Sequence, residues 1–251
     1  MELRISVLAD RPDLVDCFWD MDTTWPEFMK HDPIGNTYYA RFTDFQDYIL
    51  VCEDASAPGK IVAKGYSAPF LLTGDELFDD GWDGVIRRAL RTKLAGDIPN
   101  AVSAIEVAIE PGLQGKGLSG TILAALRDNA ARLGFAELLV PVRPNGKADP
   151  RMPMPDYAFR VRDDGLPVDP WLRVHVRAGG RIDKVAPRSM VIPGTLAEWR
   201  EWTGLPFDTT GQVIVPGALT PVWCDTEHDY AVYVEPNVWV RHRTGAASEQ
   251  S

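Results

Sequence analysis

The sequence predicts an α/β protein with a mixed, mostly antiparallel sheet flanked by helices and a β-rich extension at its C-terminal end. Two apolar runs, 48–52 and 61–72, flank a turn-rich segment and indicate an antiparallel hairpin. A strand-like run at 101–109 leads through a glycine-rich loop into a helical pattern and a further strand. Beyond residue 205, strand-like segments recur, which predicts the extension.

The N-terminal half alternates short strands and helices. Leu3 to Val7 alternates as a strand, and Pro12 opens a helical pattern that continues to Trp19. Residues 36–48 and 84–95 also carry helical patterns, on either side of the hairpin. We therefore expect helices to cover the sheet in this half.

A strand, a helix and another strand follow in the centre of the chain. Apolar residues recur every three or four positions from Leu118 to Leu133, giving a helix with one apolar face, and Gly134 fits its left-handed end. The strand at 137–144 contains Pro141 and Pro144, which cannot donate ladder hydrogen bonds. Its far half must therefore lie at an edge or leave its neighbour.

Length and composition remove several classes of protein. A chain of 251 residues can bury the core of one large domain, or of one domain with an extension. The first residues carry charges where a signal peptide needs an apolar run, and no stretch approaches the roughly 18 apolar residues of a membrane helix. Cys17, Cys52 and Cys224 show no metal-binding spacing. We expect a cytoplasmic protein with free thiols, no metal and no membrane contact.

The charge of -10 is unevenly distributed. Residues 1–100 hold 10 Lys/Arg against 18 Asp/Glu, whereas residues 139–188 hold 10 against 6. The second segment is therefore locally basic and favours a compact anionic ligand. A nucleic acid is disfavoured, because the overall negative charge opposes binding by counterion release.

The glycine-rich loop, EPGLQGKGLSG at 110–120, fits the G-x-G-x-x-G pattern of dinucleotide-binding proteins. In that fold, however, the strand runs directly into the first glycine and the next strand ends in an acid. Here EPGLQ intervenes, and the next strand ends in Arg143 and Pro144. A Walker loop also fails, since Lys116 is followed by Gly117 rather than Ser or Thr. What remains is a row of backbone N–H groups at a helix N-terminus, which suits a pyrophosphate.

This loop resembles the acyl-coenzyme A signature of the GNAT acyltransferase superfamily: Arg or Gln, two residues, Gly, one residue, then Gly or Ala. Ser119 departs mildly at the last position. The resemblance covers residues 3 to about 200 and implies a GNAT-like sheet with splayed central strands, the pantetheine arm lying in the splay. It implies acetyl-CoA, or another acyl-CoA, as cofactor, with contacts from Val107, Ile109, Gln114, Gly115, Lys116, Gly117, Leu118, Ser119 and Asn145.

The resemblance also indicates candidate catalytic residues. The family's usual acid is a tyrosine four residues before a glycine, and Gly179 matches that glycine, so His175 takes the place of the tyrosine. An imidazole is donor or acceptor at neutral pH. Glu106, on the signature strand, is the candidate base acting through a water. Each also has a structural alternative, as a histidine bonded to backbone and as a paired strand acid.

Two further segments bear on specificity. Residues 18–32 fall where the family lines its acceptor side, and they mix aromatic and acidic residues suited to a cationic amine, or to simple inward packing. The members are Trp19, Asp20, Asp22, Trp25, Glu27, Phe28 and Asp32. The proline-rich stretch at about 145–170 is longer than in short family members and predicts a lid or docking surface.

We expect a GNAT domain at 1–204 carrying that insertion, a β extension at 205–243 and a disordered tail at 244–251. The function that fits best is transfer of an acyl group from acyl-CoA to the primary or secondary amine of a small molecule. One alternative takes the acyl group from the phosphopantetheine arm of an acyl carrier protein. Another is a non-catalytic coenzyme-binding module. The sequence also leaves open whether the protein forms a homodimer.

Overall fold

A single sheet of nine strands organises the computed structural model, which describes residues 3–245. The strand order is β1-β2-β3-β4-β5-β9-β8-β7, and β6 pairs with β9 beside this path. Only β4 and β5 pair in parallel among these strands, so the predicted mostly antiparallel sheet is confirmed. The strands are β1 (Leu3–Val7), β2 (Ile49–Asp54), β3 (Ile61–Phe70), β4 (Ala101–Ile109), β5 (Glu137–Val142), β6 (Arg181–Gly194), β7 (Gly211–Val213), β8 (Val222–Asp225) and β9 (Tyr230–Arg243).

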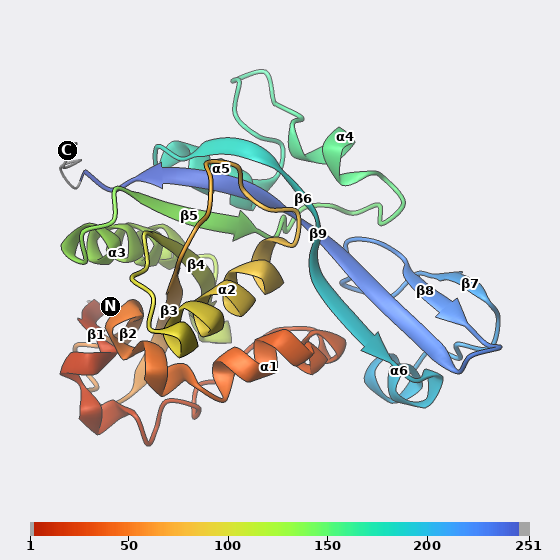
Figure 1. Ribbon diagram of the computed structural model, residues 1–251, viewed down its shortest axis with the longest axis horizontal. Helices are drawn as coiled ribbons and strands as arrows, with labels where there is room; N and C mark the ends of the chain where they lie inside the picture. The colour runs from red at the N-terminus through yellow and green to blue at the C-terminus, as the bar shows by residue number, and fades with distance from the viewer. Residues whose placement is uncertain (1–2, 246–251) are drawn as a thin grey trace.

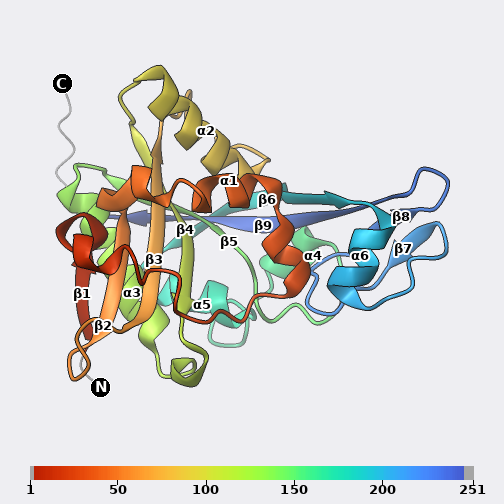
Figure 2. The same ribbon diagram turned by 90° about the horizontal axis from the view of Figure 1, so that it is seen from below.

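Helices cover both faces of the sheet (Figures 1 and 2). One apolar core lies beneath α1, α2 and α6, and the other beneath α3, α4 and α5. Within residues 3–245, no helix has both the length and the apolar composition needed to span a membrane. The helices are α1 (Pro33–Tyr39), α2 (Gly81–Ala95), α3 (Leu118–Arg132), α4 (Met154–Ala158), α5 (Pro170–Arg177) and α6 (Leu196–Thr203).

The N-terminal helical predictions need correction. The expected helix from Pro12 is a 3-10 turn over Pro12–Leu14, which begins without a side-chain cap. So short a segment gains few of the hydrogen bonds that offset helix nucleation. The helix expected at 36–48 starts earlier, at Pro33, because the Asp32 side chain accepts from the N–H groups of Ile34 and Gly35. It then gives way to a 3-10 segment over Phe42–Tyr48.

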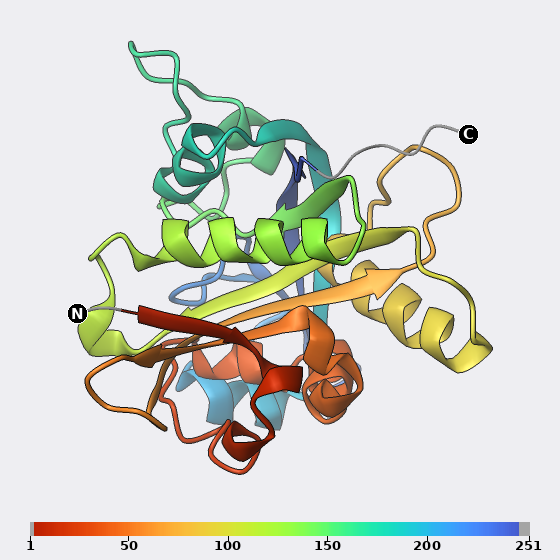
Figure 3. The same cartoon turned by 90° about the vertical axis from the view of Figure 1, so that its left-hand side faces the viewer.

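The central helix, α3, matches the predicted pattern. It packs on β3, β4 and β5, as Figure 3 shows. Its apolar face buries Ile122, Leu123 and Leu126, and it ends before Gly134, which has φ of 88°. Because glycine adopts positive φ without strain, it reverses the chain there at little cost.

The predicted divergence of the central strands is present. β4 and β5 pair only at Val102 with Leu138 and Ser103 with Leu139, near one end of each strand. The other edge of β5 pairs antiparallel with β9 along its whole length, from Glu137 to Val142. The facing edge of β4 is therefore unpaired over its second half.

The C-terminal strands belong to the same sheet. β9 lies between β5 and β8 and also pairs with β6, forming the long ribbon of Figure 1. The segment predicted as an extension at 205–243 thus provides the strand next to β5. From residue 246 on, the tail predicted as disordered lies outside the described residues.

Candidate functional site

A cavity of about 900 Å³ lies where β4 and β5 diverge. Its walls come from β3, β4, β5, α5, the glycine-rich loop and the N-terminal segment. Of the residues predicted for the site, Lys116, Gly117 and Leu118 lie outside its lining. The predicted residues that line it are Glu106, Val107, Ile109, Gln114, Gly115, Ser119, Asn145 and His175.

The second half of β4 directs main-chain groups into this cavity. The Glu110 N–H donates to the Val62 carbonyl on the β3 side at 3.0 Å. Since main-chain groups alternate along a strand, those of Val107 and Ile109 point to the opposite side, toward the divergence. A bulge precedes them, because Ile105 has no partner on β3 in the register. The edge is therefore open to an extended ligand.

The glycine-rich loop forms a cradle at the beginning of α3. Gly115 and Gly117 have φ of 75° and 80°, and a Cβ at either position would meet nothing within 4 Å. In the described part of the chain, the N–H groups of Gly115, Lys116 and Gly117 donate to no backbone carbonyl. Free N–H groups at the positive end of a helix dipole favour an anion. The residues fit a diphosphate.

Gln114 links the glycine-rich loop to the N-terminal segment on the other side of the cavity. Its Nε2 donates to Thr24 Oγ1 at 3.1 Å and to the Ile109 carbonyl at 3.3 Å. The first bond reaches the N-terminal segment, which the sequence assigns to the acceptor side. Gln114 therefore helps fix the cavity mouth.

The Glu106 carboxylate is held by two aromatic donors. Tyr39 Oη donates to one oxygen at 2.7 Å, and Trp25 Nε1 donates to the other. Burial, and then the Glu106 charge, raises the pKa of Tyr39 well above its usual range, so the phenol keeps its proton. Each carboxylate oxygen retains a lone pair for a further partner.

His175 is fully buried on α5 yet lines the cavity. Asp169 caps this helix by accepting from the N–H groups of Trp171 and Leu172. His175 Nδ1 lies 2.9 Å from His242 Nε2, and its Nε2 has no hydrogen-bond partner among the described residues. Burial, followed by the neighbouring His242, lowers the pKa of His175 to about 3. The imidazole is therefore neutral at pH 7, with one nitrogen free.

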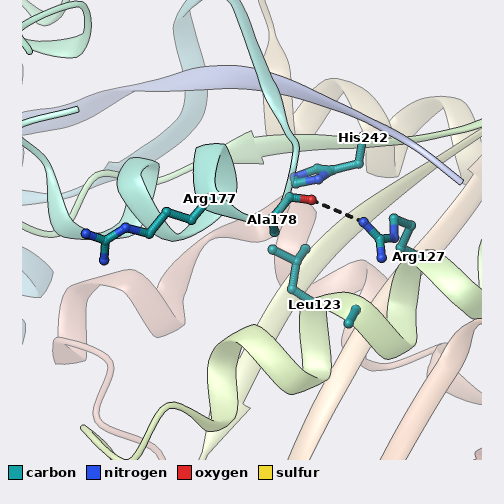
Figure 4. A pocket seen from close by; sticks show the side chains of 6 residues that line it. Leu123, Arg127, Arg177, Ala178 and His242 are labelled. Carbon is teal, nitrogen blue, oxygen red and sulfur yellow. Dashed lines mark hydrogen bonds between the residues drawn. The ribbon is translucent and has the colours of Figure 1, made fainter. Parts of the chain in front are cut away.

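His242 lines a second, smaller pocket of about 250 Å³ between α3 and the end of α5 (Figure 4). Burial lowers its pKa to about 4, and the charge of Arg127 contributes. Arg127 is fixed by donating to the Ala178 carbonyl at 3.1 Å. Nothing in the sequence connects His242 with His175, because the two residues are distant in the chain and their contact depends on β9 pairing with β6.

Lys64 is a cavity residue that sequence reasoning missed. Its side chain is 1% exposed, donates to the Phe18 carbonyl at 2.9 Å and lies 4.6 Å from the Phe18 ring centre. Burial lowers the pKa of Lys64 to about 8, and the Glu106 charge partly opposes this. The signal in the sequence that could have indicated Lys64 is that it is the single lysine of the apolar strand IVAKGYSAPF.

The predicted acceptor segment divides between cavity and core. Phe28 packs in the core, and Glu27 pairs with Lys30 at the surface. Asp20 does not line the cavity. Of the aromatic and acidic residues predicted for the acceptor side, those that line the cavity are Trp19, Asp22, Trp25 and Asp32.

No protein-family model matches the chain. A curated relative does: the arginine N-acetyltransferase avaD of Aspergillus versicolor is 33% identical over 269 residues, which cover 95% of this chain and 93% of that protein. Among solved structures, the fold is similar to the loading GNATL domain of CurA from Lyngbya majuscula (19% identity, 97% of each chain, TM-score 0.58). It is also similar to the GphF GNAT-like decarboxylase in complex with isobutyryl-CoA (17% identity, 97% and 100% of the two chains, TM-score 0.56).

The divergent strands, the glycine cradle and the cavity between them define an acyltransferase of the GNAT type. On its likeness to the curated relative, this chain belongs to the GNAT superfamily.

Proposed function

We propose that the protein transfers an acyl group, acetyl as the first choice, from coenzyme A to an amine of a small cationic molecule by direct attack. The observation that carries this proposal is the unpaired edge of β4 at Val107 and Ile109, facing a cavity that begins at the glycine cradle. An extended pantetheine arm could pair with this edge while its diphosphate occupies the cradle.

The residues assigned to the coenzyme divide by the part they contact. Gly115, Lys116, Gly117, Leu118 and Ser119 supply the diphosphate seat, with the Lys116 ammonium as an added charge. Val107 and Ile109 pair with the arm, and the Ile109 N–H serves the developing oxyanion. Gln114 and Asn145 border the path between the cradle and the cavity.

Glu106 and His175 have different proposed roles. Glu106, oriented by Tyr39 and Trp25, accepts a proton from the acceptor ammonium through a water. His175 is neutral, and with its hydrogen on Nε2 it donates a hydrogen bond that stabilises the departing thiolate, which takes its proton from water. In that tautomer His242 Nε2 donates to His175 Nδ1, which fixes the ring.

The acceptor is proposed to be arginine or a molecule with a similar cationic end. The curated relative is named for arginine, and the acceptor half of this cavity carries the carboxyl groups of Asp22, Asp32 and Glu106 beside aromatic rings. Carboxylates and π faces both stabilise a guanidinium or ammonium group.

The test is release of free thiol from acetyl-CoA in the presence of arginine, with mass spectrometry of the product. The His175→Ala variant should lose turnover by about 100-fold while the Kd for acetyl-CoA stays near normal. His228→Ala, at an exposed turn, is the matched control. Equal turnover in His175→Ala removes His175 from the mechanism, and coenzyme binding without turnover on a broad amine panel indicates a binding module instead.

A carrier-bound donor is a second candidate, favoured by one surface feature. In the 145–170 insertion, Phe159 and Val161 are 52% and 61% exposed and alternate with Arg160 and Arg162. Apolar side chains among arginines suit a small acidic carrier protein. If this donor is the natural one, Arg160→Glu lowers turnover from an acyl carrier and leaves turnover from acetyl-CoA unchanged.

A further inference from the structure

Two buried carboxyl groups face each other at the acceptor end of the cavity. Asp32, just before α1, is 2% exposed, and Asp83, on α2, is fully buried. Asp32 Oδ1 accepts from the N–H groups of Ile34 and Gly35, each at 2.8 Å. Asp83 Oδ2 accepts from Arg87 Nη2 at 3.1 Å and from the Val191 N–H at 3.2 Å. One oxygen of each group is thus satisfied.

The other two oxygens, Asp32 Oδ2 and Asp83 Oδ1, receive no N–H or O–H donor within residues 3–245. The two carboxyl groups are close enough for the charge on Asp32 to act on Asp83. Two ionised carboxylates side by side would repel each other, and a hydrogen bond between their open oxygens would need a proton, because two carboxylate oxygens are both acceptors. Burial raises the pKa of both groups, and the Asp32 charge raises that of Asp83 further. The pair therefore holds one proton.

The pair opens to the cavity through Asp32, which lines it beside Tyr39 and Trp82. Arg87 is the cation that contacts the pair from outside, and it is bound to Asp80 as well as to Asp83. Three cations line the cavity, and each bonds elsewhere: Lys30 to Glu27, Lys64 to the Phe18 carbonyl and Arg143 to Glu235. No described cation therefore reaches Asp32 from the cavity side.

We propose that the Asp32–Asp83 pair binds the cationic end of the acceptor, a guanidinium or ammonium group, and releases its shared proton when that group arrives. This inference rests on the proposed function and adds the residues that select the acceptor. An incoming N–H donor satisfies the open oxygen of Asp32, the member of the pair that lines the cavity, and the positive charge replaces the proton that the pair can no longer hold. Tyr39 and Trp82 cover the flanks of the bound group.

The experiment compares arginine with citrulline, its neutral isostere, by isothermal titration calorimetry at pH 7 in two buffers of different ionisation enthalpy. The wild type should bind arginine at least 10-fold more tightly than citrulline and release close to one proton. Asp32→Asn keeps the oxygen that caps α1, and it should abolish both the preference and the proton release. Asp83→Asn should also abolish the proton release.

Asp80→Asn is the matched control, because it removes another carboxylate bound to Arg87 that does not line the cavity. It should bind arginine as the wild type does. If Asp32→Asn retains the preference for arginine, or if the wild type releases no proton, the inference is wrong and the pair only joins α1 to α2. Calorimetry needs no turnover, so absent thiol release from acetyl-CoA refutes the proposed function separately.

Discussion

His175 shows how the surroundings of one residue set its chemistry. An exposed imidazole is half-charged near pH 6.5, but here burial and the contact with His242 keep the ring neutral. A neutral ring with a free Nε2 offers one hydrogen bond to the cavity, much as a tyrosine does. In the role proposed for it, His175 therefore supplies a hydrogen-bond donor rather than a titrating acid.

The same pair makes stability depend on pH. Both histidines have pKa values lowered in the fold, to about 3 and about 4, against about 6.5 in the unfolded chain. The unfolded state then binds more protons, so stability is complete above pH 6.5 and is lost as pH falls toward 4. The loss is at most roughly 1.4 kcal/mol per pH unit for each histidine.

Urea unfolding at pH 7 and pH 5 checks this expectation. A double variant, His175→Gln with His242→Gln, should lose less stability than the wild type between the two pH values, since it has no buried imidazole to protonate. His228→Gln, which alters an exposed residue, should behave as the wild type. An identical pH dependence in the double variant contradicts the lowered pKa values.

At the scale of elements, the glycine loop and α3 act as one unit. The loop supplies free N–H groups, and the 15-residue helix behind it supplies the dipole. Apolar contacts with β3, β4 and β5 hold the helix in place. The helix behind the proposed diphosphate seat is therefore held in position before a ligand arrives, which lowers the entropic cost of binding.

Gly117→Asp should weaken binding of acetyl-CoA by at least 10-fold, because a carboxylate then stands where the diphosphate is proposed to lie. Gly134→Asp is the matched control: the same change, at a similar positive φ, at the other end of α3. Both variants carry comparable backbone strain, so a thermal shift separates stability from affinity. Equal coenzyme affinity in the two variants argues against the seat.

Elements that depend on local pattern could be predicted from the sequence. The strand at 101–109 and the helix ending before Gly134 are present, because periodicity and turn chemistry act over a few residues. The proline-bearing strand predicted at 137–144 is present but ends at Val142, before Pro144. Tyr39, Lys64 and His242 could not be placed, since their roles come from contacts between distant segments. The helix expected from Pro12 is only a 3-10 turn over Pro12–Leu14.

At the scale of the whole molecule, β9 joins parts that the sequence separates. It pairs with β5 beside the cavity, with β6 along their shared length and with β8 toward the far end of the ribbon. It also buries Val238, Trp239 and Val240. The strand is thus a central member of the sheet.

A chain ended at residue 204 should fail to fold, because β5 and β6 then lose their common partner and expose apolar edges. A chain ended at residue 245 keeps every described strand and should match the full chain. Circular dichroism and thermal melting of the two proteins check this. Cooperative unfolding of the shorter chain supports the predicted domain boundary at 204 instead.

The position of β9 also orders events during synthesis. Every other described strand leaves the ribosome before β9. The sheet beside the cavity, where β9 pairs with β5, therefore stays incomplete until residue 243 has emerged. A nascent chain that stops before β9 leaves this edge of β5 unpaired, and an unpaired strand edge is prone to aggregation.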